Sequence, residues 1–187
     1  MLRLLTTTAV VAVGLLGTHP SFAQTNQPSP GHVWSGRDTP SPEDKTFVKE
    51  AATGGMAEVE LSKIAQKSDN ADVKRFADRM VDDHTAANQQ LTTIATGLGI
   101  EMPKALDSEH ERLRQKLATL HGKAFDDQYM RDMVGDHKQA VRLFQQEERS
   151  GREPQLKQFA QKTLPTLEEH QKMAIDLSRR LSQTAAR

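Results

Sequence analysis

The sequence predicts an all-α protein, an antiparallel four-helix bundle with a short helix in the crossover between its two halves. Apolar residues recur at alternating steps of three and four along four segments of about 26 residues, which is the period of an amphipathic helix. Hydrophobic residues are 36% of the chain but aromatic ones only 4%, a composition that favours helices over sheets. With the short crossover helix, five helices are expected. The links after the first and the fourth of them are short, which indicates antiparallel neighbours.

The first two helices have clear start and stop signals. The first begins at Ser41 and Pro42 and runs to about residue 68, since proline is tolerated at an early helical position where its missing N–H costs nothing. Asn70 caps the second helix, because its side chain can accept a bond from the first free backbone N–H groups. The second helix is expected to end at Gly97.

The remaining helices follow the same logic. A short third helix is opened by a capping box from Ser108 to Glu111 and closes near Gly122. The fourth helix is expected over residues 124–150, where a glycine follows it. The fifth helix is expected over residues 154–182, with a proline at its first position. The short helix therefore occupies the long crossover between two helical hairpins.

The segment before the first helix is predicted to direct export. Residues 1–23 combine a basic start at Arg3, an apolar stretch of about 13 residues and Ala23, the layout of a signal peptide cleaved after that alanine. A spanning helix needs about 20 apolar residues, so we expect no transmembrane anchor. Residues 24–41 are rich in proline and small polar residues and predict a flexible tether to a helical domain, residues 42–184. We expect a periplasmic or secreted protein.

Charge and residue usage exclude several classes of function. The 25 basic side chains balance 25 acidic ones, and loss of Arg3 with the signal peptide leaves one net negative charge, so nucleic acid has no basic surface to bind. The absence of cysteine removes disulfides and thiolate metal ligands. Glycine-rich phosphate loops and the Gly-x-Ser-x-Gly nucleophile motif are also missing. We expect a protein that is not an enzyme, and a small redox enzyme is the least favoured interpretation.

One ionisable residue interrupts the apolar seam of each long helix. In chain order these residues are Glu58, His84, His137 and His170. Each lies within about three positions, or about 4 Å, of the middle of its helix. Because antiparallel helices of equal length share a central plane, we expect these side chains to converge at one level in the core.

Such a layer has two chemical interpretations, since an unpaired polar group in an apolar core costs several kcal/mol. One carboxylate and three imidazoles suit a single Zn, Fe, Cu or Ni ion. Alternatively, Glu58 accepts hydrogen bonds from the imidazoles and fixes the register of the helices as a buried polar network. The acids directly before the histidines, Asp83, Asp136 and Glu169, point about 100° away from them and are expected to be ordinary surface charges facing solvent or a neighbouring helix.

Five motifs between about residues 43 and 182 carry a family resemblance. They are Phe47 to Ala65, Arg79-Met80-Val81-Asp82-Asp83-His84, Ala124-Phe125-Asp126-Asp127-Gln128-Tyr129, Asp136-His137, and Thr163-Leu164-Pro165 to His170. In this order they resemble a bacterial family called domain of unknown function 4142. The resemblance implies export and a ferritin-like helical bundle, with a metal site by analogy. The di-iron ferritin motif Glu-x-x-His is absent, since Val81, Val134 and Leu167 stand three residues before the histidines, so any metal should be a single ion.

The sequence thus supports two hypotheses on function. In the first, a periplasmic bundle binds one transition metal through Glu58, His84, His137 and His170 for storage, sensing or protection of the envelope under stress. In the second, the polar layer is structural and the protein is a non-enzymatic envelope component. Its helix surfaces would then bind a partner, either a second copy of the chain or another envelope protein.

Overall fold

A computed structural model describes residues 39–184, and this stretch contains five helices and no strand. The helices are α1 (Pro42–Ala65), α2 (Ala71–Gly97), α3 (Ser108–Ala118), α4 (Gly122–Ser150) and α5 (Pro154–Thr184). The predicted all-α class is confirmed. The predicted signal peptide and nearly all of the predicted tether lie outside the described residues.

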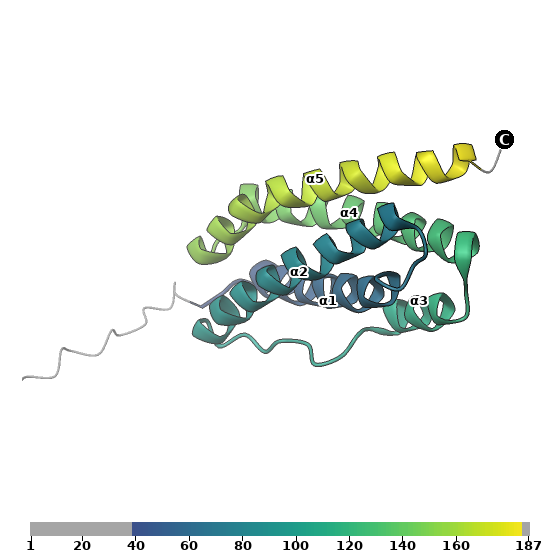
Figure 1. Cartoon of the computed structure of the whole chain (residues 1–187). Helices are drawn as coiled ribbons and strands as arrows, with labels where there is room; N and C mark the ends of the chain where they lie inside the picture. Colours follow the sequence, from purple (N-terminus) through teal and green to yellow (C-terminus); the bar gives the residue numbers. More distant parts are fainter. Residues whose placement is uncertain (1–38, 185–187) are drawn as a thin grey trace, which may run out of the picture. The chain divides into compact units, whose positions relative to one another are not determined.

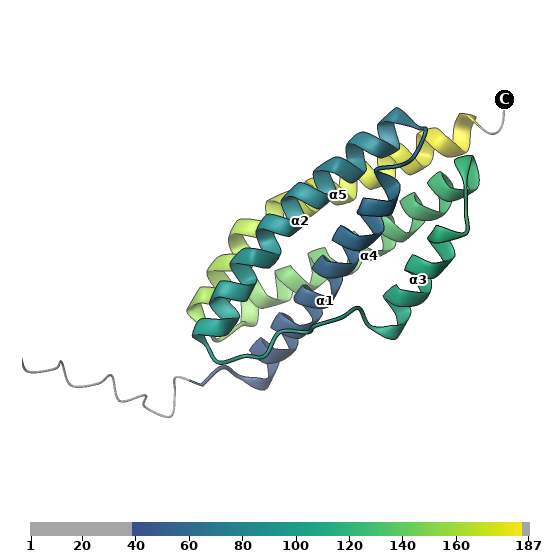
Figure 2. The ribbon, with the colours of Figure 1, turned by 60° about the horizontal axis from the view of Figure 1, so that its bottom comes forward.

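The four long helices pack side by side, each against two others (Figure 1). Helix α1 packs on α2 and α4, and α5 packs on the same two helices, so the contacts close a ring. The short helix α3 lies against α1 and α4 at the end of a long connection (Figure 2). None of the described helices has the length and apolarity needed to cross a membrane.

The apolar core is divided into two clusters along the helices. One cluster includes Phe47, Leu91, Phe144 and Phe159, with ring centroids of Phe47 and Phe144 5.1 Å apart. The other cluster includes Phe76, Leu117, Tyr129 and Met133, all of them buried. All four long helices contribute to both clusters, and their ionisable seam residues fall between the two stretches. The layer of ionisable residues therefore lies at the centre of the bundle, with apolar packing on both sides.

The third helix starts differently from the predicted capping box. Its N-cap is Asp107 and not Ser108, and the Asp107 carboxylate accepts the backbone N–H groups of Glu109 and His110, both at 2.9 Å. A carboxylate at this position also favours the positive end of the helix dipole, which explains why it displaces the serine. Helix α4 begins at Gly122, whose φ of 51° suits a glycine at a helix boundary.

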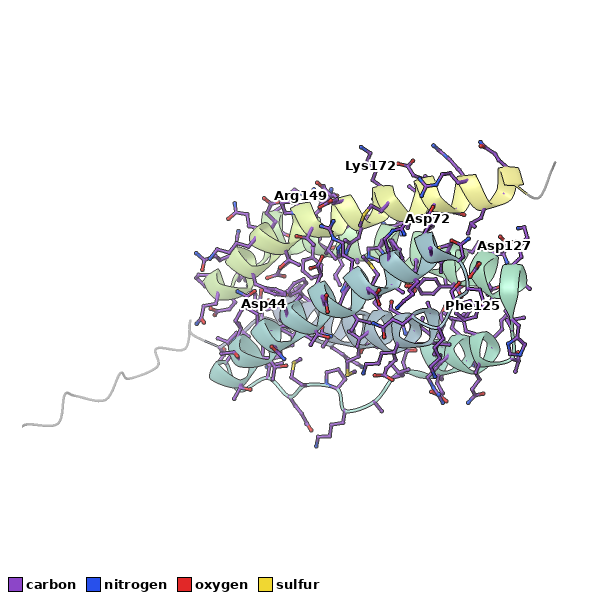
Figure 3. The ribbon with its side chains drawn as sticks, viewed as in Figure 1. Asp44, Asp72, Phe125, Asp127, Arg149 and Lys172 are labelled. Carbon is purple, nitrogen blue, oxygen red and sulfur yellow. The ribbon has the colours of Figure 1, made fainter. Side chains whose placement is uncertain are left out.

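The start of α1 is tied to the connection between α4 and α5. The Asp44 N–H donates to the Ser41 hydroxyl over 3.1 Å, and the Ser41 N–H donates to Asp44 Oδ2 over 2.9 Å. Oδ1 of the fully buried Asp44 accepts the N–H of Arg152 at 2.9 Å and that of Glu153 at 3.3 Å. Burial and the neighbouring Asp44 carboxylate raise the pKa of Glu147 to about 7. Asp44 and Phe125 mark opposite ends of the helices (Figure 3).

Glu147→Gln is expected to change how stability depends on pH. The folded-state pKa of Glu147 lies above its unfolded value of 4.5. The stability that the protonated Glu147 contributes is therefore fully present below pH 4.5, and it is lost as pH rises through about 7. The amide cannot ionise, so the variant does not lose this stability. When pH is raised from about 5 to about 8, the free energy of unfolding of the variant should improve by about 1 kcal/mol relative to wild type, after allowance for solvent screening. Urea unfolding at both pH values measures this difference. Glu148→Gln controls for net charge, and the same pH dependence in all three proteins would contradict the assignment.

Candidate metal centre

The four seam residues meet in one buried layer between the two apolar clusters. Glu58 and His84 are 3% and 4% exposed, and His137 and His170 are fully buried. The three imidazole centroids lie 5.2 to 5.5 Å apart. One ring nitrogen from each histidine lies within 4.8 Å of the other two, and no other His or acidic group of this kind occurs among residues 39–184. The structure thus brings together side chains that are far apart in the sequence.

One nitrogen of each imidazole is held by an acceptor. The pairs are His84 Nδ1 with Glu58 Oε2 at 3.0 Å, His137 Nδ1 with the Met133 carbonyl oxygen at 2.9 Å, and His170 Nε2 with Asp83 Oδ2 at 2.8 Å. In a neutral imidazole the nitrogen facing an acceptor carries the proton, which leaves the other nitrogen with a lone pair. Acceptors of this kind fix the orientation of histidines in metal sites.

The other nitrogen of each ring has no hydrogen-bond partner. These atoms are His84 Nε2, His137 Nε2 and His170 Nδ1, and all three are buried. A buried polar atom without a partner loses its hydration and gains nothing in return, at a cost of about 1–3 kcal/mol each. Three such atoms in one layer of a packed core form the donor set that a metal ion with imidazole ligands requires.

Glu58 lies beside the imidazoles, but its carboxylate does not belong to the group of atoms that lie within 4.8 Å of one another. Its Oε2 pairs with His84. Its Oε1 is 3.4 Å from His137 Nδ1, but that nitrogen bonds to the Met133 carbonyl, so Oε1 is left without a partner. The group of atoms within 4.8 Å contains the three histidines alone. Glu58 therefore lies where it orients His84, and it supplies the buried negative charge of the layer.

The four ionisable side chains of the layer differ in how readily each becomes charged. Burial opposes ionisation, yet the surrounding imidazoles lower the pKa of Glu58 to about 2. Burial is the largest single influence and disfavours a charged His84, but the charge of Glu58, its hydrogen bond and the charge of Asp83 together outweigh it and raise the pKa of His84. Burial, with the charge of His84, lowers the pKa of His137 and brings that of His170 to about 4. The layer therefore favours one buried ion pair beside two neutral imidazoles.

The acids that precede the histidines have three different environments, and the prediction of ordinary surface charge is right only for Glu169. Glu169 is exposed and binds Arg79 across the helices at 2.9 Å. Asp83 faces a neighbouring helix, as expected, but accepts from the buried His170. Asp136 is half-buried, its Oδ2 has no partner, and burial is the main cause that raises its pKa to about 7. The sequence contained no signal for these two roles, because each depends on which helix lies opposite.

Comparisons with known proteins give a family and a fold. A family model described as Domain of unknown function (DUF4142) matches residues 34–177. A DUF305 fragment from Deinococcus radiodurans superposes with a TM-score of 0.67 at 16% identity, over 76% of this chain and 99% of that chain. A putative secreted protein DUF305 from Streptomyces coelicolor superposes with a TM-score of 0.62 at 19% identity, over 75% and 92%. Identities this low establish a similar fold alone, and no curated protein matches the chain.

Proposed function

The chain belongs to the family described as Domain of unknown function (DUF4142), and from its own central layer we propose that it binds one transition metal ion. The ligands are the imidazoles of His84, His137 and His170. The observation that carries this proposal is the set of three buried ring nitrogens, one from each histidine, that have no hydrogen-bond partner. The opposite nitrogen of each ring already has an acceptor, which is how histidine ligands are held in metal sites.

The two carboxylates next to the histidines favour a divalent ion. Glu58 and Asp83 each lie at hydrogen-bond distance from the outer nitrogen of a proposed ligand. Their negative charges would offset much of the charge of a divalent ion bound by neutral imidazoles, although Asp83 Oδ2 also accepts from Arg79 at 3.2 Å. Zn, Fe, Cu and Ni all accept imidazole ligands. We infer that Glu58 belongs to the centre as its charged member and that the ion is stored, sensed or held for protection of the envelope under stress.

We also propose the finer architecture and the location. The ring of contacts among the four long helices supports an antiparallel bundle of the ferritin-like type, with α3 in the crossover. The layout of residues 1–23 supports export to the periplasm or beyond after cleavage at Ala23, and one structural relative is described as a putative secreted protein.

A second candidate function is a structural layer in an envelope interaction protein. The observation that favours it is the Glu58–His84 pair at 3.0 Å, because this contact satisfies part of the layer without any ion. A buried polar layer can fix the register of packed helices. The partner would be a second copy of the chain or another envelope protein. Metal content separates the two candidates.

Purified protein is expected to bind one equivalent of a divalent transition metal. Elemental analysis and isothermal titration calorimetry after incubation with Zn, Cu, Fe or Ni measure the stoichiometry. His137→Ala removes a fully buried donor and should weaken binding by about 100-fold or more, since even outer partners of metal ligands contribute 10–100-fold. His121→Ala is the matched control, because His121 is exposed and lies just before α4. Absence of bound metal in wild type after all four incubations would leave the structural layer as the function.

A further inference from the structure

The acceptors that hold the three imidazoles differ in how far they reach the surface. The Glu58 side chain is 4% exposed and Met133 is fully buried, whereas the Asp83 side chain is 36% exposed. Asp83 Oδ2 lies 2.8 Å from Nε2 of the buried His170. Among these three contacts, only the one between Asp83 and His170 connects the histidine layer to the surface of the bundle.

The other approaches to the layer are closed. Along the bundle, one apolar cluster packs on each side of it. A cavity of about 490 Å³ is lined in part by Glu58 and His84, but their unpartnered atoms, Glu58 Oε1 and His84 Nε2, are buried. An ion that is to reach the three histidines must therefore pass a part of the protein that opens transiently.

Arg79 ties Asp83 to the neighbouring helix. Its Nε donates to Asp83 Oδ2 over 3.2 Å, so this oxygen is shared between Arg79 and His170. Nη1 and Nη2 of the same guanidinium donate to the two carboxylate oxygens of Glu169 over 3.0 and 2.9 Å. Arg79 and Asp83 lie on α2, and Glu169 and His170 lie on α5. These bonds therefore hold the two helices together directly beside a buried ligand.

This link is suited to opening without loss of the fold. The side chains of Arg79 and Glu169 are 42% and 53% exposed, and ion pairs at such exposure are weak. With the guanidinium in place, its positive charge opposes the approach of a cation. Once it has moved away, Asp83 and Glu169 are two free carboxylates beside His170, and they attract a divalent cation.

We propose that Arg79, Asp83 and Glu169 form a gate between α2 and α5 through which the metal ion enters and leaves the histidine layer. This inference rests on the proposed metal site. The side-chain hydrogen bonds of Arg79 and Glu169 go to each other and to Asp83, and not to a proposed ligand. Arg79 and Glu169 therefore set the rate of metal exchange and not the affinity.

Rate constants for Co²⁺ test the gate. Arg79→Met keeps the apolar part of the side chain and removes the guanidinium, and Glu169→Ala removes the carboxylate that holds it. Stopped-flow absorption of bound Co²⁺ measures the association rate constant, and a chase with EDTA measures the dissociation rate constant. Both constants are expected to rise about threefold or more in each variant, because a surface ion pair no longer opposes opening. The Kd, which is the ratio of the two, should stay unchanged.

The charges of these residues, acting without a gate, would give a different pattern. Loss of Arg79 removes a positive charge and should speed the association of a cation, whereas loss of Glu169 removes a negative charge and should slow it. The gate predicts faster exchange in both variants. Arg75→Met and Glu168→Ala make the same two charge changes at exposed positions on the same two helices, and they should keep the rate constants of wild type.

The outcomes separate the gate from the metal site. Wild-type rate constants in both gate variants, slower association in Glu169→Ala, or a changed Kd without faster association would overturn the gate and leave the metal site intact. Failure of wild type to bind Co²⁺ or any of the four other metals would overturn the metal site, and the gate with it.

Discussion

Glu58→Ala is expected to lower the free energy of unfolding of the metal-free protein by about 3–5 kcal/mol at neutral pH. Glu58 and His84 are almost fully buried, and Glu58 Oε2 lies 3.0 Å from His84 Nδ1. Removal of the carboxylate leaves an imidazolium without its counter-charge in an apolar core. The ring can lose its proton, but its Nδ1–H then still lacks an acceptor, so the destabilisation is reduced and not abolished.

Urea denaturation of three further variants isolates this pair. Glu60→Ala is the matched control, since Glu60 lies on the same helix and pairs with Lys63 at 2.7 Å, but both side chains are about half exposed. An exposed pair of this kind contributes about 0.2–1 kcal/mol. Glu58→Gln keeps an acceptor for His84 and should cost less than the alanine variant. The double variant Glu58→Leu with His84→Leu removes both charges and should recover much of the loss.

The size of the Glu58 effect distinguishes a buried ion pair from a solvated one. A cost for Glu58→Ala no greater than that for Glu60→Ala would mean that water reaches the layer and screens its charges. A double variant as unstable as the single one would mean that packing at this level, and not charge, is what the layer contributes. Either result would remove the electrostatic basis of the site.

The central layer was predictable because both of its causes are local in the sequence. An amphipathic helix buries one face, and Glu58, His84, His137 and His170 occupy that face near the middle of each long segment. Similar helix lengths, from 24 to 31 residues, with short connections after α1 and α4 then bring the four to one level. This prediction needed no knowledge of long-range contacts, because the position of each residue along its own helix fixes its level in the bundle.

The partners of the imidazoles were not predictable by the same logic. Asp83 reaches His170 across 87 residues of sequence, so the pairing depends on the rotation of α2 against α5. The acceptor for His137 is the backbone carbonyl of Met133, which any residue would provide. The sequence placed Glu58 among the ligands and gave no sign of its 3.0 Å contact with His84 Nδ1.

Zinc is expected to raise the free energy of unfolding by about 2.7 kcal/mol at a free concentration of a hundred times its dissociation constant, and by about 4.1 kcal/mol at a thousand times. The three histidines lie on α2, α4 and α5, so an unfolded chain does not hold their nitrogens within 4.8 Å of each other. Binding to the folded state alone converts affinity into stability. Thermal and urea unfolding with and without Zn²⁺ measure the gain, and EDTA should reverse it.

His170→Ala and Glu58→Gln separate donation to the metal from support of the ligands. His170→Ala removes one of three nitrogens and should abolish the zinc-dependent gain, whereas the exposed His121→Ala should keep it. Glu58→Gln retains all three nitrogens but removes a carboxylate beside them, so zinc should still stabilise this variant with an affinity about 10–100-fold weaker. Equal stabilisation of wild type and His170→Ala would show that zinc binds elsewhere on the protein. No stabilisation of Glu58→Gln would instead show that Glu58 is itself a ligand, because loss of a charged group beside the ligands weakens a metal site without eliminating it.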